Sequence, residues 1–404
     1  MKILQVNCVY GTGSTGKIVK DIHDELMQND IESIVCYGRG PIVNELNVHK
    51  ICGELYSKIN NVWSRICGIK YGGLNYSTWK LERIILKEKP DVVHLHCING
   101  YFVNIYKIIS FLKKHKFKTV VSLHAEFMYT ANCGHAFDCK KWKTGCGHCP
   151  VWKLETKSFW FDRTAKSWSL MKKAFDGFNH GLIVTSVSPW LMNRAKQSPI
   201  LSDKYHTVVM NGLNTEIFHP YDDDNTRKSL GLDVSEKVVF HATPSFSDLT
   251  TDIKGGKYIC ELAKLMPSVK FVVAGPYKKI SVPDNVILLG RVSDQTKLAQ
   301  LYSMANVTIL TSKRETFSMV CAESLSCGTP VSGFYAGGPE SIALCEYSNW
   351  AEYGNVHDLK NSTEHFLLNP VDSIVCSQKA AALYSRSVMT TEYLNVYKQL
   401  ISIK

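Results

Sequence analysis

The chain has 404 residues, enough for two domains of ordinary size, and a hydrophobic content of 45% supports packed cores. Lys and Arg outnumber Asp and Glu by 47 to 36, a net charge of +11 that suits nucleotide diphosphates, acidic membrane surfaces or nucleic acid. No segment reaches the roughly 20 apolar residues of a membrane span, and no repeat or low-complexity tract is evident, which argues against integral membrane, repeat and disordered proteins.

The N-terminal segment MKILQVNCVY has a short apolar run that contains polar Gln5 and Asn7. This pattern predicts a first strand rather than a signal peptide. Fourteen cysteines would be many for a secreted chain of this size, and a reducing compartment explains them more simply. We therefore expect a cytoplasmic protein.

A glycine-rich loop, Gly11-Thr-Gly-Ser-Thr-Gly-Lys17, follows the first predicted strand and precedes a helix predicted from about Thr15 to Met27. The loop is similar to the phosphate-binding motif G-x4-G-K-[ST], which cradles phosphates with backbone amides. Ile18 stands where that motif needs a hydroxyl group for magnesium. A true P-loop and a tight strand-to-helix turn that needs glycine both remain open.

Between residues 33 and 124, predicted strands alternate with predicted helices, which indicates a parallel sheet covered by helices. Ligands of such sheets bind beyond the carboxyl ends of the strands. The histidines His94, His96 and His124 fall at such ends, together with Asn99. A single histidine is more often a packing residue than a functional one.

Four cysteines form the most unusual local feature, with the spacing Cys133-x5-Cys139-x6-Cys146-x2-Cys149. Four thiolates suit a tetrahedral zinc ion, and Cys-x2-Cys is a recurrent chelate spacing, although the first pair is spaced more widely than usual. A structural zinc site is our first hypothesis for the insert 133–149. Disulfides, free thiols, and a redox or iron–sulfur role remain the alternatives.

A helix rich in Trp, Phe and Lys is predicted over residues 157–175. Its aromatic and basic residues would suit a membrane surface. Aromatic residues at helical spacing more often belong to a core, and we interpret these as core.

The second domain is predicted to open with a strand over residues 237–242, and Lys254 follows at a predicted helix start. A lysine there can neutralise a diphosphate that becomes more negative as its sugar leaves, an effect that is largest in the transition state. A solvated surface lysine is the alternative.

The segment 311–340, TSKRETFSMVCAESLSCGTPVSGFYAGGPE, gives the strongest indication of a binding site. It follows a predicted strand over 306–310 and contains a helix predicted over 317–326. The amides of the first helical turn can hold a phosphate, whereas Glu315 and Glu323 suit the hydroxyl groups of a ribose or another sugar. From spacing alone, two solvated surface glutamates are the alternative.

Glu315-x7-Glu323 followed by Gly337-Gly338-Pro339-Glu340 resembles the donor-site signature of retaining GT-B glycosyltransferases, specifically glycosyltransferase family 4. The resemblance extends over nearly the whole chain, and several bacterial surface-polysaccharide enzymes are similar in having a Cys-rich insert. It implies an α/β fold of two doubly wound Rossmann-like domains facing across a cleft. The implied domains are an N-terminal acceptor-side domain over 1–215, a C-terminal donor domain over 216–385, and a C-terminal helix over 386–404 that crosses back to the first domain.

The same resemblance implies roles for individual residues. Glu315 would approach the donor sugar, Glu323 would hold the nucleotide ribose, and Lys254 would face the diphosphate. The other implied donor contacts are the amides of Phe317 and Ser318, the glycine-rich loop through Gly13, Ser14 and Gly16, and Arg291 beside the base.

Two positions depart from the family pattern. His124 matches a histidine that faces the donor sugar, but Ala125 replaces the aspartate that usually follows it, which puts a proton-transfer role in doubt. The arginine that usually precedes the lysine is missing, and its candidate substitutes are Lys313, Arg314 or a residue of the N-terminal domain.

The resemblance implies a retaining enzyme that moves a sugar from a nucleotide-diphosphate sugar to a glycan or lipid-linked saccharide, in bacterial capsule, O-antigen or exopolysaccharide synthesis. No catalytic metal is expected, so that zinc in the insert would be structural. A lipid-linked acceptor would bring the protein to the inner leaflet of the plasma membrane, and nucleic acid is not an expected partner.

Other functions remain open on the sequence alone. A P-loop phosphatase or kinase would use Gly11–Lys17 with magnesium, and a zinc-bearing nucleic-acid-binding protein would use the positive charge and the cysteines. A GT-B epimerase would share the fold but turn over a nucleotide sugar without an acceptor.

Overall fold

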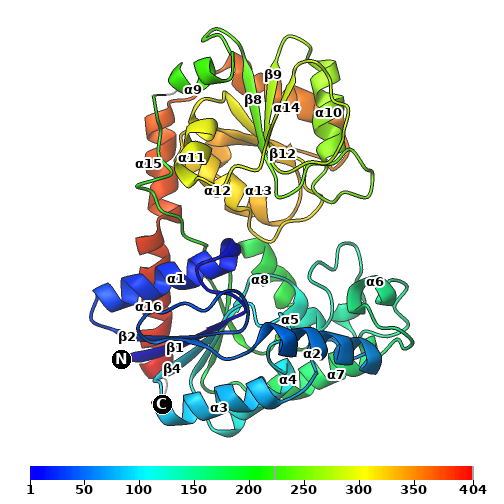
Figure 1. The fold of residues 1–404 in the computed structure, drawn as a ribbon, viewed down its shortest axis with the longest axis vertical. Coiled ribbons are helices and arrows are strands. Elements are labelled where there is room, and N and C mark those ends of the chain that lie inside the picture. Colours follow the sequence, from blue (N-terminus) through cyan, green and yellow to red (C-terminus); the bar gives the residue numbers. More distant parts are fainter. Residues whose placement is uncertain (223, 403–404) are drawn as a thin grey trace. The chain divides into compact units, whose positions relative to one another are not determined.

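The computed structural model describes residues 1–222 and 224–402, and the chain divides into two compact units (Figure 1). Unit 1 contains Met1–Met210 and the chain from Met389 onward, and unit 2 contains Asn211–Val388. The boundaries expected from the sequence lie after residues 215 and 385. Each unit is one parallel sheet with covering helices, which confirms the predicted α/β class with two doubly wound domains.

The sheet of unit 1 has seven strands in the order β3-β2-β1-β4-β5-β6-β7. All its pairings are parallel, and its central strands are almost wholly buried because helices cover both faces. The strand order reverses between β1 and β4, where ligands of doubly wound sheets bind. The strands are β1 (Lys2–Asn7), β2 (Glu32–Tyr37), β3 (Val48–Lys50), β4 (Val92–Leu95), β5 (Thr119–Leu123), β6 (Leu182–Ser186) and β7 (Tyr205–Val208).

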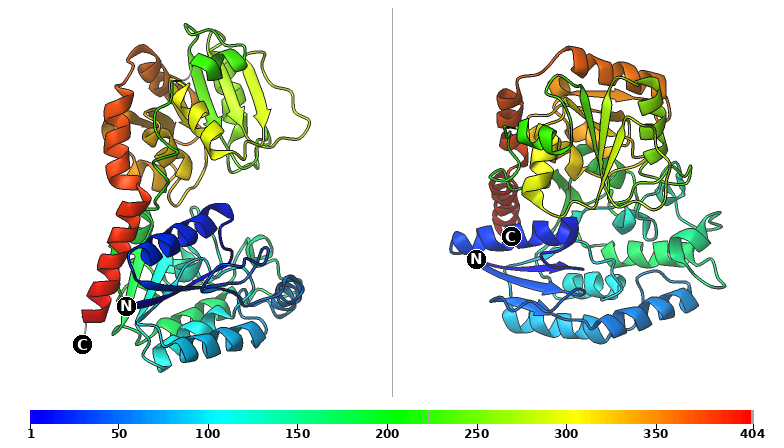
Figure 2. Two further views of the ribbon diagram at one scale, coloured as in Figure 1. Left: turned by 60° about the vertical axis from the view of Figure 1, so that its left-hand side comes forward. Right: turned by 45° about the horizontal axis from the view of Figure 1, so that its top comes forward.

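The helices of unit 1 include the last helix of the chain, α16, which lies beside the sheet of this unit (Figure 2). From Met389 on, its side chains share a core cluster with Ile18 and Ile22 of α1 and with the strands. The helices are α1 (Gly13–Gln28), α2 (Glu54–Cys67), α3 (Tyr76–Glu88), α4 (Ile105–Lys114), α5 (Phe127–Thr130), the short η1 (Lys141–Lys143), α6 (Trp152–Thr156), α7 (Thr164–Phe175), α8 (Pro189–Ala195) and α16 (Arg386–Ser402).

The sheet of unit 2 has six parallel strands in the order β10-β9-β8-β11-β12-β13, with the reversal between β8 and β11. Its core cluster includes Ile259 and Leu262 of α10 and Leu359 and Phe366 of α14. The strands are β8 (Val238–Ala242), β9 (Lys270–Ala274), β10 (Val286–Gly290), β11 (Val307–Leu310), β12 (Val331–Phe334) and β13 (Ser348–Ala351). The helices are α9 (Asp224–Ser229), α10 (Gly256–Leu265), α11 (Gln295–Ser303), α12 (Met319–Ser326), α13 (Gly338–Ile342), the short η2 (Cys345–Tyr347), α14 (Val356–Leu368) and α15 (Ser373–Tyr384).

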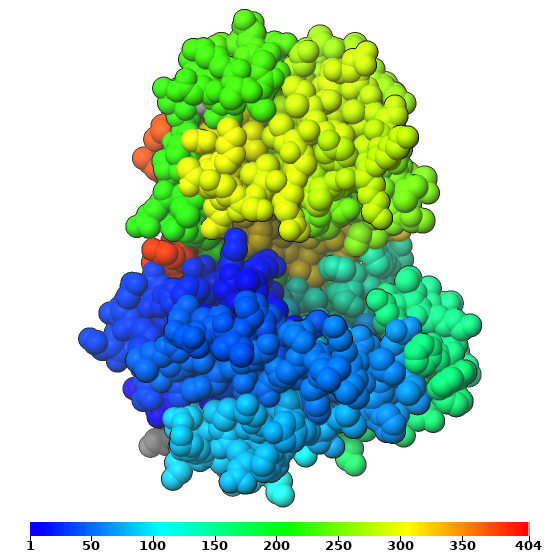
Figure 3. Space-filling model, viewed as in Figure 1, coloured from blue at the N-terminus to red at the C-terminus, as the bar shows by residue number. Residues whose placement is uncertain are grey.

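One predicted element of unit 1 was wrong in part. The helix expected over 157–175 is α7, which begins only at Thr164, and residues 159–161 before it are exposed rather than core. Helix α2, which lies at the surface of unit 1, is not among the helices expected from the sequence (Figure 3). None of the helices in the described part of the chain combines the length and apolar character that crossing a bilayer requires.

Helix α16 is joined to the sheet by buried hydrogen bonds as well as by apolar contacts. The Tyr397 hydroxyl lies 2.7 Å from His94 Nδ1, and the Tyr393 hydroxyl lies 2.9 Å from Ser122 Oγ. His94 Nε2 also lies 2.7 Å from Ser122 Oγ, so the two tyrosines belong to one network. All four side chains are buried, so that removing one partner would leave a buried polar atom without its hydrogen bond and destabilise the fold.

We expect Tyr397→Phe to destabilise unit 1, because it leaves His94 Nδ1 without this partner in a buried site. Such a loss costs about 1–3 kcal/mol and lowers the melting temperature by about 5 °C in a domain of this size. Thermal unfolding compares it with Tyr205→Phe, whose ring is exposed on β7. Equal melting of the two variants would show that the hydrogen bond does not stabilise the unit.

Candidate functional site

The loops that follow three neighbouring strands of unit 2 bring most of the predicted donor residues together. Lys254 follows β8, Glu315 follows β11, and Gly337 and Gly338 follow β12. These strands are adjacent and parallel, so their carboxyl ends lie at one edge of the sheet. This edge includes the strand reversal of unit 2.

Lys254 Nζ donates a hydrogen bond to Glu315 Oε1, and the two side chains form an ion pair. The backbone of Lys254 is fixed on both sides, because its N–H donates to Asp252 Oδ1 at 3.0 Å and its carbonyl accepts from Thr311 Oγ1 at 2.8 Å. Gly255 has a φ of +73°, and a Cβ there would lie 2.3 Å from the carbonyl oxygen of Thr311. A glycine is therefore needed for the loop to hold the lysine this close to β11.

The Gly-Gly-Pro-Glu turn holds the loop that carries Glu315. The Glu315 N–H donates to Ala336 O at 3.1 Å, and the Gly338 N–H donates to Glu315 O at 2.9 Å. A Cβ on Gly338 would lie 2.4 Å from the carbonyl carbon of Thr316, so the two backbones are in direct contact. The Glu340 carboxylate accepts from the Gly337 N–H at 2.7 Å, and its role is therefore to shape the turn.

Helix α12 begins in this site. Its N-cap is Ser318, whose Oγ accepts from the Cys321 N–H at 3.3 Å. Ser318 has a φ of +88°, which is costly for a residue with a side chain and is typical of functional loops. Phe317 is buried and packs against Tyr384 at 6.3 Å between ring centroids, so its backbone amide rather than its ring is the group available for a phosphate.

Glu323 lies one turn further along α12 and is half-buried. The Tyr302 hydroxyl donates to Glu323 Oε2 at 2.9 Å. Burial, together with the nearby Glu323 carboxylate, raises the pKa of Tyr302 well above its usual value, so the phenol stays a donor and orients the carboxylate. Tyr302 was not among the predicted site residues.

Two other predicted residues do not join this group. Arg291 is exposed after β10, the outermost strand, and β9 separates β10 from β8. The Lys313 ammonium, expected as a substitute cation, lies 5.8 Å from the centre of the Tyr353 ring. The Lys254–Glu315 pair is thus the charged centre of the arrangement in unit 2.

His241 in β8 is a buried residue of the same edge that the sequence analysis missed. Its Nδ1 donates to Ile309 O at 2.9 Å, which leaves Nε2 as the unprotonated nitrogen, and Nε2 has no hydrogen-bond partner among the described residues. Burial lowers its pKa to about 4. The signal that drew attention to His124, a histidine at the end of a strand, could also have found His241.

In unit 1, the glycine-rich loop forms the entry into α1. Gly11 and Gly13 both have a φ of +65°, and the Gly11 N–H donates to Gly16 O at 2.9 Å. Gly13 and Ser14 are exposed in the first turn of α1, whereas Gly16 is buried, and a Cβ there would lie 3.0 Å from Val9 Cγ2. Gly16 therefore serves the packing of α1 on the strand end. Ile18 faces the core, which argues against the P-loop alternative.

The histidines at the strand ends of unit 1 form a directed chain of hydrogen bonds. His96 Nε2 lies 3.2 Å from Gln5 Oε1, an acceptor, so Nε2 carries the proton and His96 Nδ1 accepts. His124 Nε2, at 3.3 Å, must then donate to His96 Nδ1. Burial lowers the pKa of His124 to about 4, so at neutral pH this chain holds a neutral imidazole in one tautomer.

The Cys-rich insert is attached to the segment that follows His124. The buried Glu126 carboxylate accepts from the Ala136 N–H of the insert and from Arg194 Nε. The Arg194 guanidinium also lies 5.1 Å from the centre of the Trp142 ring, in the insert. These contacts therefore attach the insert to α8 and to the His124 segment.

The four predicted zinc ligands do not form a ligand set in the arrangement described. No group of three or more His, Cys, Asp or Glu side chains in residues 1–222 and 224–402 is placed to hold a metal ion, and Cys133, Cys139, Cys146 and Cys149 are free thiols. Burial and the nearby Cys139 and Cys149 thiols raise the pKa of Cys146 to about 12. The zinc site stays a prediction.

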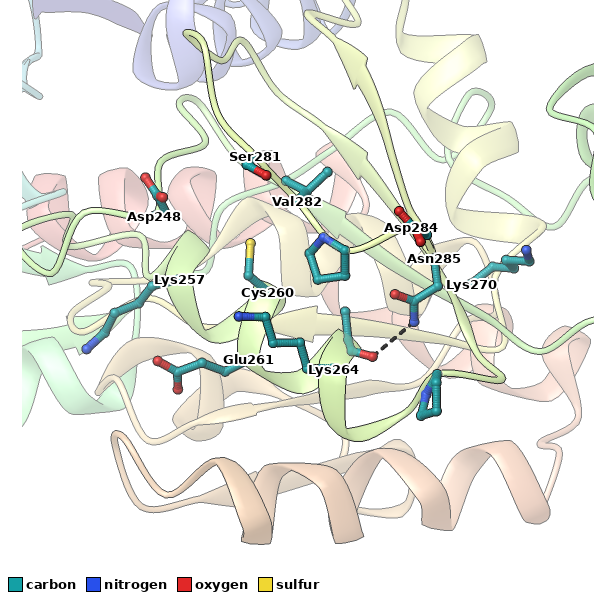
Figure 4. A pocket seen from close by; sticks show the side chains of 13 residues that line it. Asp248, Lys257, Cys260, Glu261, Lys264, Lys270, Ser281, Val282, Asp284 and Asn285 are labelled. Carbon is teal, nitrogen blue, oxygen red and sulfur yellow. Dashed lines mark hydrogen bonds between the residues drawn. The ribbon is translucent and has the colours of Figure 1, made fainter.

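A hollow of about 820 Å³ in unit 2 contains none of the predicted residues (Figure 4). Basic side chains such as Lys257 and Lys264 lie around it together with acidic Glu261 and Asp284. The Asn285 side chain donates to the Ala263 carbonyl at 3.0 Å and thereby attaches the loop before β10 to the end of α10. Because Lys254, Glu315 and Glu323 are not among its lining residues, the hollow is separate from the predicted donor residues.

Comparisons with known proteins agree with this geometry. Residues 224–383 match the family model of glycosyl transferases group 1. The putative colanic acid biosynthesis glycosyl transferase WcaC of Escherichia coli K12 is 22% identical over 426 residues, covering 99% of this chain and 100% of that protein. The chain is a glycosyltransferase.

Solved structures show that this glycosyltransferase has the GT-B fold. HepE of Anabaena, solved in complex with UDP, superposes with a TM-score of 0.67 at 15% identity, covering 99% of this chain and 100% of that one. The lipopolysaccharide outer core galactosyltransferase WaaB, solved in its apo form, gives 0.64 at 12% identity with the same coverage. The family match falls on the unit that contains Lys254, Glu315 and Glu323.

The zinc prediction for the glycosyltransferase is decided by elemental analysis. If the insert binds zinc as predicted, the purified protein contains one zinc ion per chain, and Cys146→Ser with Cys149→Ser loses it. Cys345→Ser is the control, because this exposed cysteine lies outside the insert. A metal-free protein with four titratable thiols would refute the site.

The buried histidines also predict a pH dependence of stability. The folded-state pKa of His124 is about 4 and its unfolded value is about 6.5, so the unfolded chain binds the extra proton. The stabilisation is complete above pH 6.5 and is lost as the pH falls toward 4, by about 2 kcal/mol at pH 5. Unfolding followed from pH 7.5 to pH 5 should show a shallower loss for His124→Gln than for the exposed control His180→Gln. Equal slopes would contradict the burial of a neutral His124.

Proposed function

We propose that the protein is a retaining glycosyltransferase of family 4 that transfers a sugar from a nucleotide-diphosphate sugar to a saccharide or lipid-linked saccharide acceptor. The Lys254–Glu315 pair carries the proposal, because it places a fixed cation and a carboxylate at the start of α12. A diphosphate needs the cation and the helix amides, and sugar hydroxyl groups need the carboxylate.

The donor would bind mainly on unit 2. The amides of Phe317 and Ser318 and the positive end of α12 would hold the diphosphate, and Glu323, oriented by Tyr302, would accept from the ribose hydroxyl groups. Glu315 would accept from the hydroxyl groups of the donor sugar. Gly13, Ser14, Gly16 and Arg291 are further proposed donor contacts, of which Gly13 and Ser14 lie in the exposed first turn of α1.

The proposed chemistry breaks the bond between the anomeric carbon and the diphosphate oxygen and forms the bond to the acceptor oxygen on the same face. The acceptor proton passes to an oxygen of the departing phosphate, so no protein side chain is required as base. Lys254 then neutralises charge that grows as the bond breaks, which stabilises the transition state more than the ground state. His124, a neutral imidazole, would contact the donor sugar as a hydrogen-bonding group rather than as a proton carrier.

The proposed acceptor class follows from the relatives. The Escherichia coli relative is named for colanic acid biosynthesis, and WaaB is named for the lipopolysaccharide outer core. Capsule, O-antigen or exopolysaccharide synthesis is therefore the proposed process, and it would take place at the cytoplasmic face of the plasma membrane. HepE was solved with UDP, which supports a nucleotide-diphosphate sugar as donor.

Thermal unfolding with a panel of nucleotide diphosphates and nucleotide sugars, without added magnesium, tests the donor site. We expect one nucleotide sugar to stabilise the protein, by roughly 2.7 kcal/mol at one hundred times its dissociation constant. Glu323→Ala should abolish this shift, whereas Glu261→Ala, an exposed glutamate on α10, should keep it.

Lys17→Ala separates the proposal from the P-loop alternative, because Lys17 is exposed in α1 and has no role in the proposed donor site. The nucleotide-sugar shift should survive this substitution. Stabilisation by ATP or GTP with magnesium alone, lost in Lys17→Ala and unaffected by Glu323→Ala, would overturn the proposed function.

A further inference from the structure

Helix α2 is inverted relative to an ordinary surface helix. Its buried residues are polar, Ser57, Asn60 and Ser64, and its outer face is apolar. Asn60 is wholly buried, where its Nδ2 donates to Tyr101 O at 2.7 Å and its Oδ1 accepts from the Leu74 N–H at 2.6 Å. Hydrogen bonds therefore anchor α2 to unit 1, and its apolar side chains are left for solvent.

The exposed side chains form a stripe at helical spacing. Leu55 is 72% exposed, Ile59 is 50% exposed, and Val62 and Trp63 are 47% exposed, with Ile66 one turn further on. Their positions differ by three or four residues, so they lie on one face of the helix. An apolar face of this length normally faces a core or a partner, because its exposure to water is unfavourable.

Aromatic residues extend the stripe at one end of α2. The Phe159 N–H donates to Arg65 O at 3.1 Å, and the Arg65 guanidinium lies 4.5 Å from the centre of the Phe159 ring. Phe159 begins the run Phe159-Trp160-Phe161, in which Trp160 is 64% exposed. This run is the aromatic-basic segment that the sequence analysis assigned to a core.

Aromatic residues also flank α2 on the side of α3. The Tyr76 N–H donates to the Tyr56 hydroxyl of α2 at 3.0 Å, and the rings of Tyr76 and Trp79 are 6.2 Å apart. Both are largely exposed. Figure 3 shows α2 in blue and the segment after residue 150 in green on one face of unit 1. We call this face the α2 surface, made of Leu55, Ile59, Val62, Trp63, Ile66, Tyr76, Trp79, Phe159, Trp160 and Phe161.

The charges around the α2 surface are mainly positive. Residues 54–83 and 151–166 contain nine Lys and Arg and four Asp and Glu. One of the four, Glu54, is paired with Arg39, and another, Asp162, accepts from the Cys149 and Thr164 amides. Lys58 and Lys157 are exposed at the stripe. The surface is therefore complementary to an apolar phase with an anionic boundary.

A cavity of about 470 Å³ opens beside the stripe and is lined by Trp63, Ile69, Tyr106 and Leu170, with Lys107 among its polar residues. An apolar cavity next to a lysine suits an acyl chain next to a phosphate. A protein interface would be expected to contain few lysines, whereas Trp and Tyr beside Lys and Arg are typical of the boundary between lipid and water.

We propose that the α2 surface docks the protein on an anionic phospholipid membrane. The stripe and the aromatic residues enter the boundary between headgroups and acyl chains, and the flanking lysines and arginines contact the phosphates. The inference deepens the proposed function, because a lipid-linked acceptor is presented at such a membrane. Docking itself needs neither donor nor acceptor.

Vesicle co-sedimentation of the full-length protein, without nucleotide or acceptor, tests the proposal. We expect binding to phosphatidylglycerol-rich vesicles, weak binding to pure phosphatidylcholine vesicles, and a blue shift of tryptophan emission on binding. Ile59→Glu with Val62→Glu should abolish binding. Lys58→Gln with Lys157→Gln should weaken it by about fivefold per charge at low salt, and the difference should shrink as salt rises.

Matched controls lie on unit 2. Leu368→Glu with Ile374→Glu replaces apolar residues that are at least as exposed, and Lys228→Gln with Lys264→Gln removes two exposed charges. All four variants should keep the thermal stability of the parent, because none of their side chains is buried. Both controls should keep full vesicle binding.

Three outcomes would overturn the docking proposal. They are absent binding to both kinds of vesicle, equal loss in the control variants, and a concentration-dependent dimer that Ile59→Glu with Val62→Glu dissociates, which would make the α2 surface an interface between copies. Stabilisation by a nucleotide sugar is measured separately on the same variants. The docking proposal can thus fail while the proposed function stands, and the proposed function can fail while docking is observed.

Discussion

The contact between two backbones at Gly338 determines where Glu315 of the candidate site lies. A side chain at this position would overlap the peptide bond between Thr316 and Phe317, so the loops after β11 and β12 can close only because it is a glycine. Their closure positions Glu315, and a second glycine contact, between Gly255 and Thr311, positions Lys254. These two glycine contacts, neither of which has room for a methyl group, therefore hold the Lys254–Glu315 ion pair near the start of α12. An electrostatic site that is organised before its ligand arrives loses little energy in reorganisation.

In unit 1, hydrogen bonds between buried side chains hold the residues at the strand ends in place. Polar side chains that would be costly when buried alone are joined by hydrogen bonds into two groups. One contains His94, Ser122 and two tyrosines of α16, and the other contains Gln5, His96 and His124. In the second group, the direction of both hydrogen bonds follows from the acceptor at Gln5, and this determines which nitrogen of His124 carries a proton. The insert after His124 is fixed by the buried Glu126 carboxylate and a guanidinium.

The fold class could be predicted because alternating strands and helices leave a clear pattern of apolar and polar residues along the sequence. The sequence also singled out Lys254, Glu315 and Glu323, which the structure places in two loops and in α12 of unit 2, and their roles in donor binding stay a prediction. It did not reveal His241 or Tyr302, because their roles depend on which strands and helices become neighbours. The exposed run 159–161 was assigned to a core because periodicity shows that one face differs from another, not which face is buried. Helix α2 shows the same limit, since its apolar spacing is that of a core helix although its polar face is buried.

The last helix has a consequence for the order in which the chain folds. Residues 211–388 form unit 2 without a contribution from either end of the chain, but unit 1 needs Met389, Tyr393 and Tyr397 in its core. During synthesis, all of unit 2 therefore leaves the ribosome before the core of unit 1 can be completed. Through that interval, the core cluster that contains Ile18, Ile22 and Val92 lacks the side chains of α16. Unit 1, which contains the N-terminal residues, is thus the last unit whose core is completed. Premature termination within the final helix would leave that core without part of its side chains.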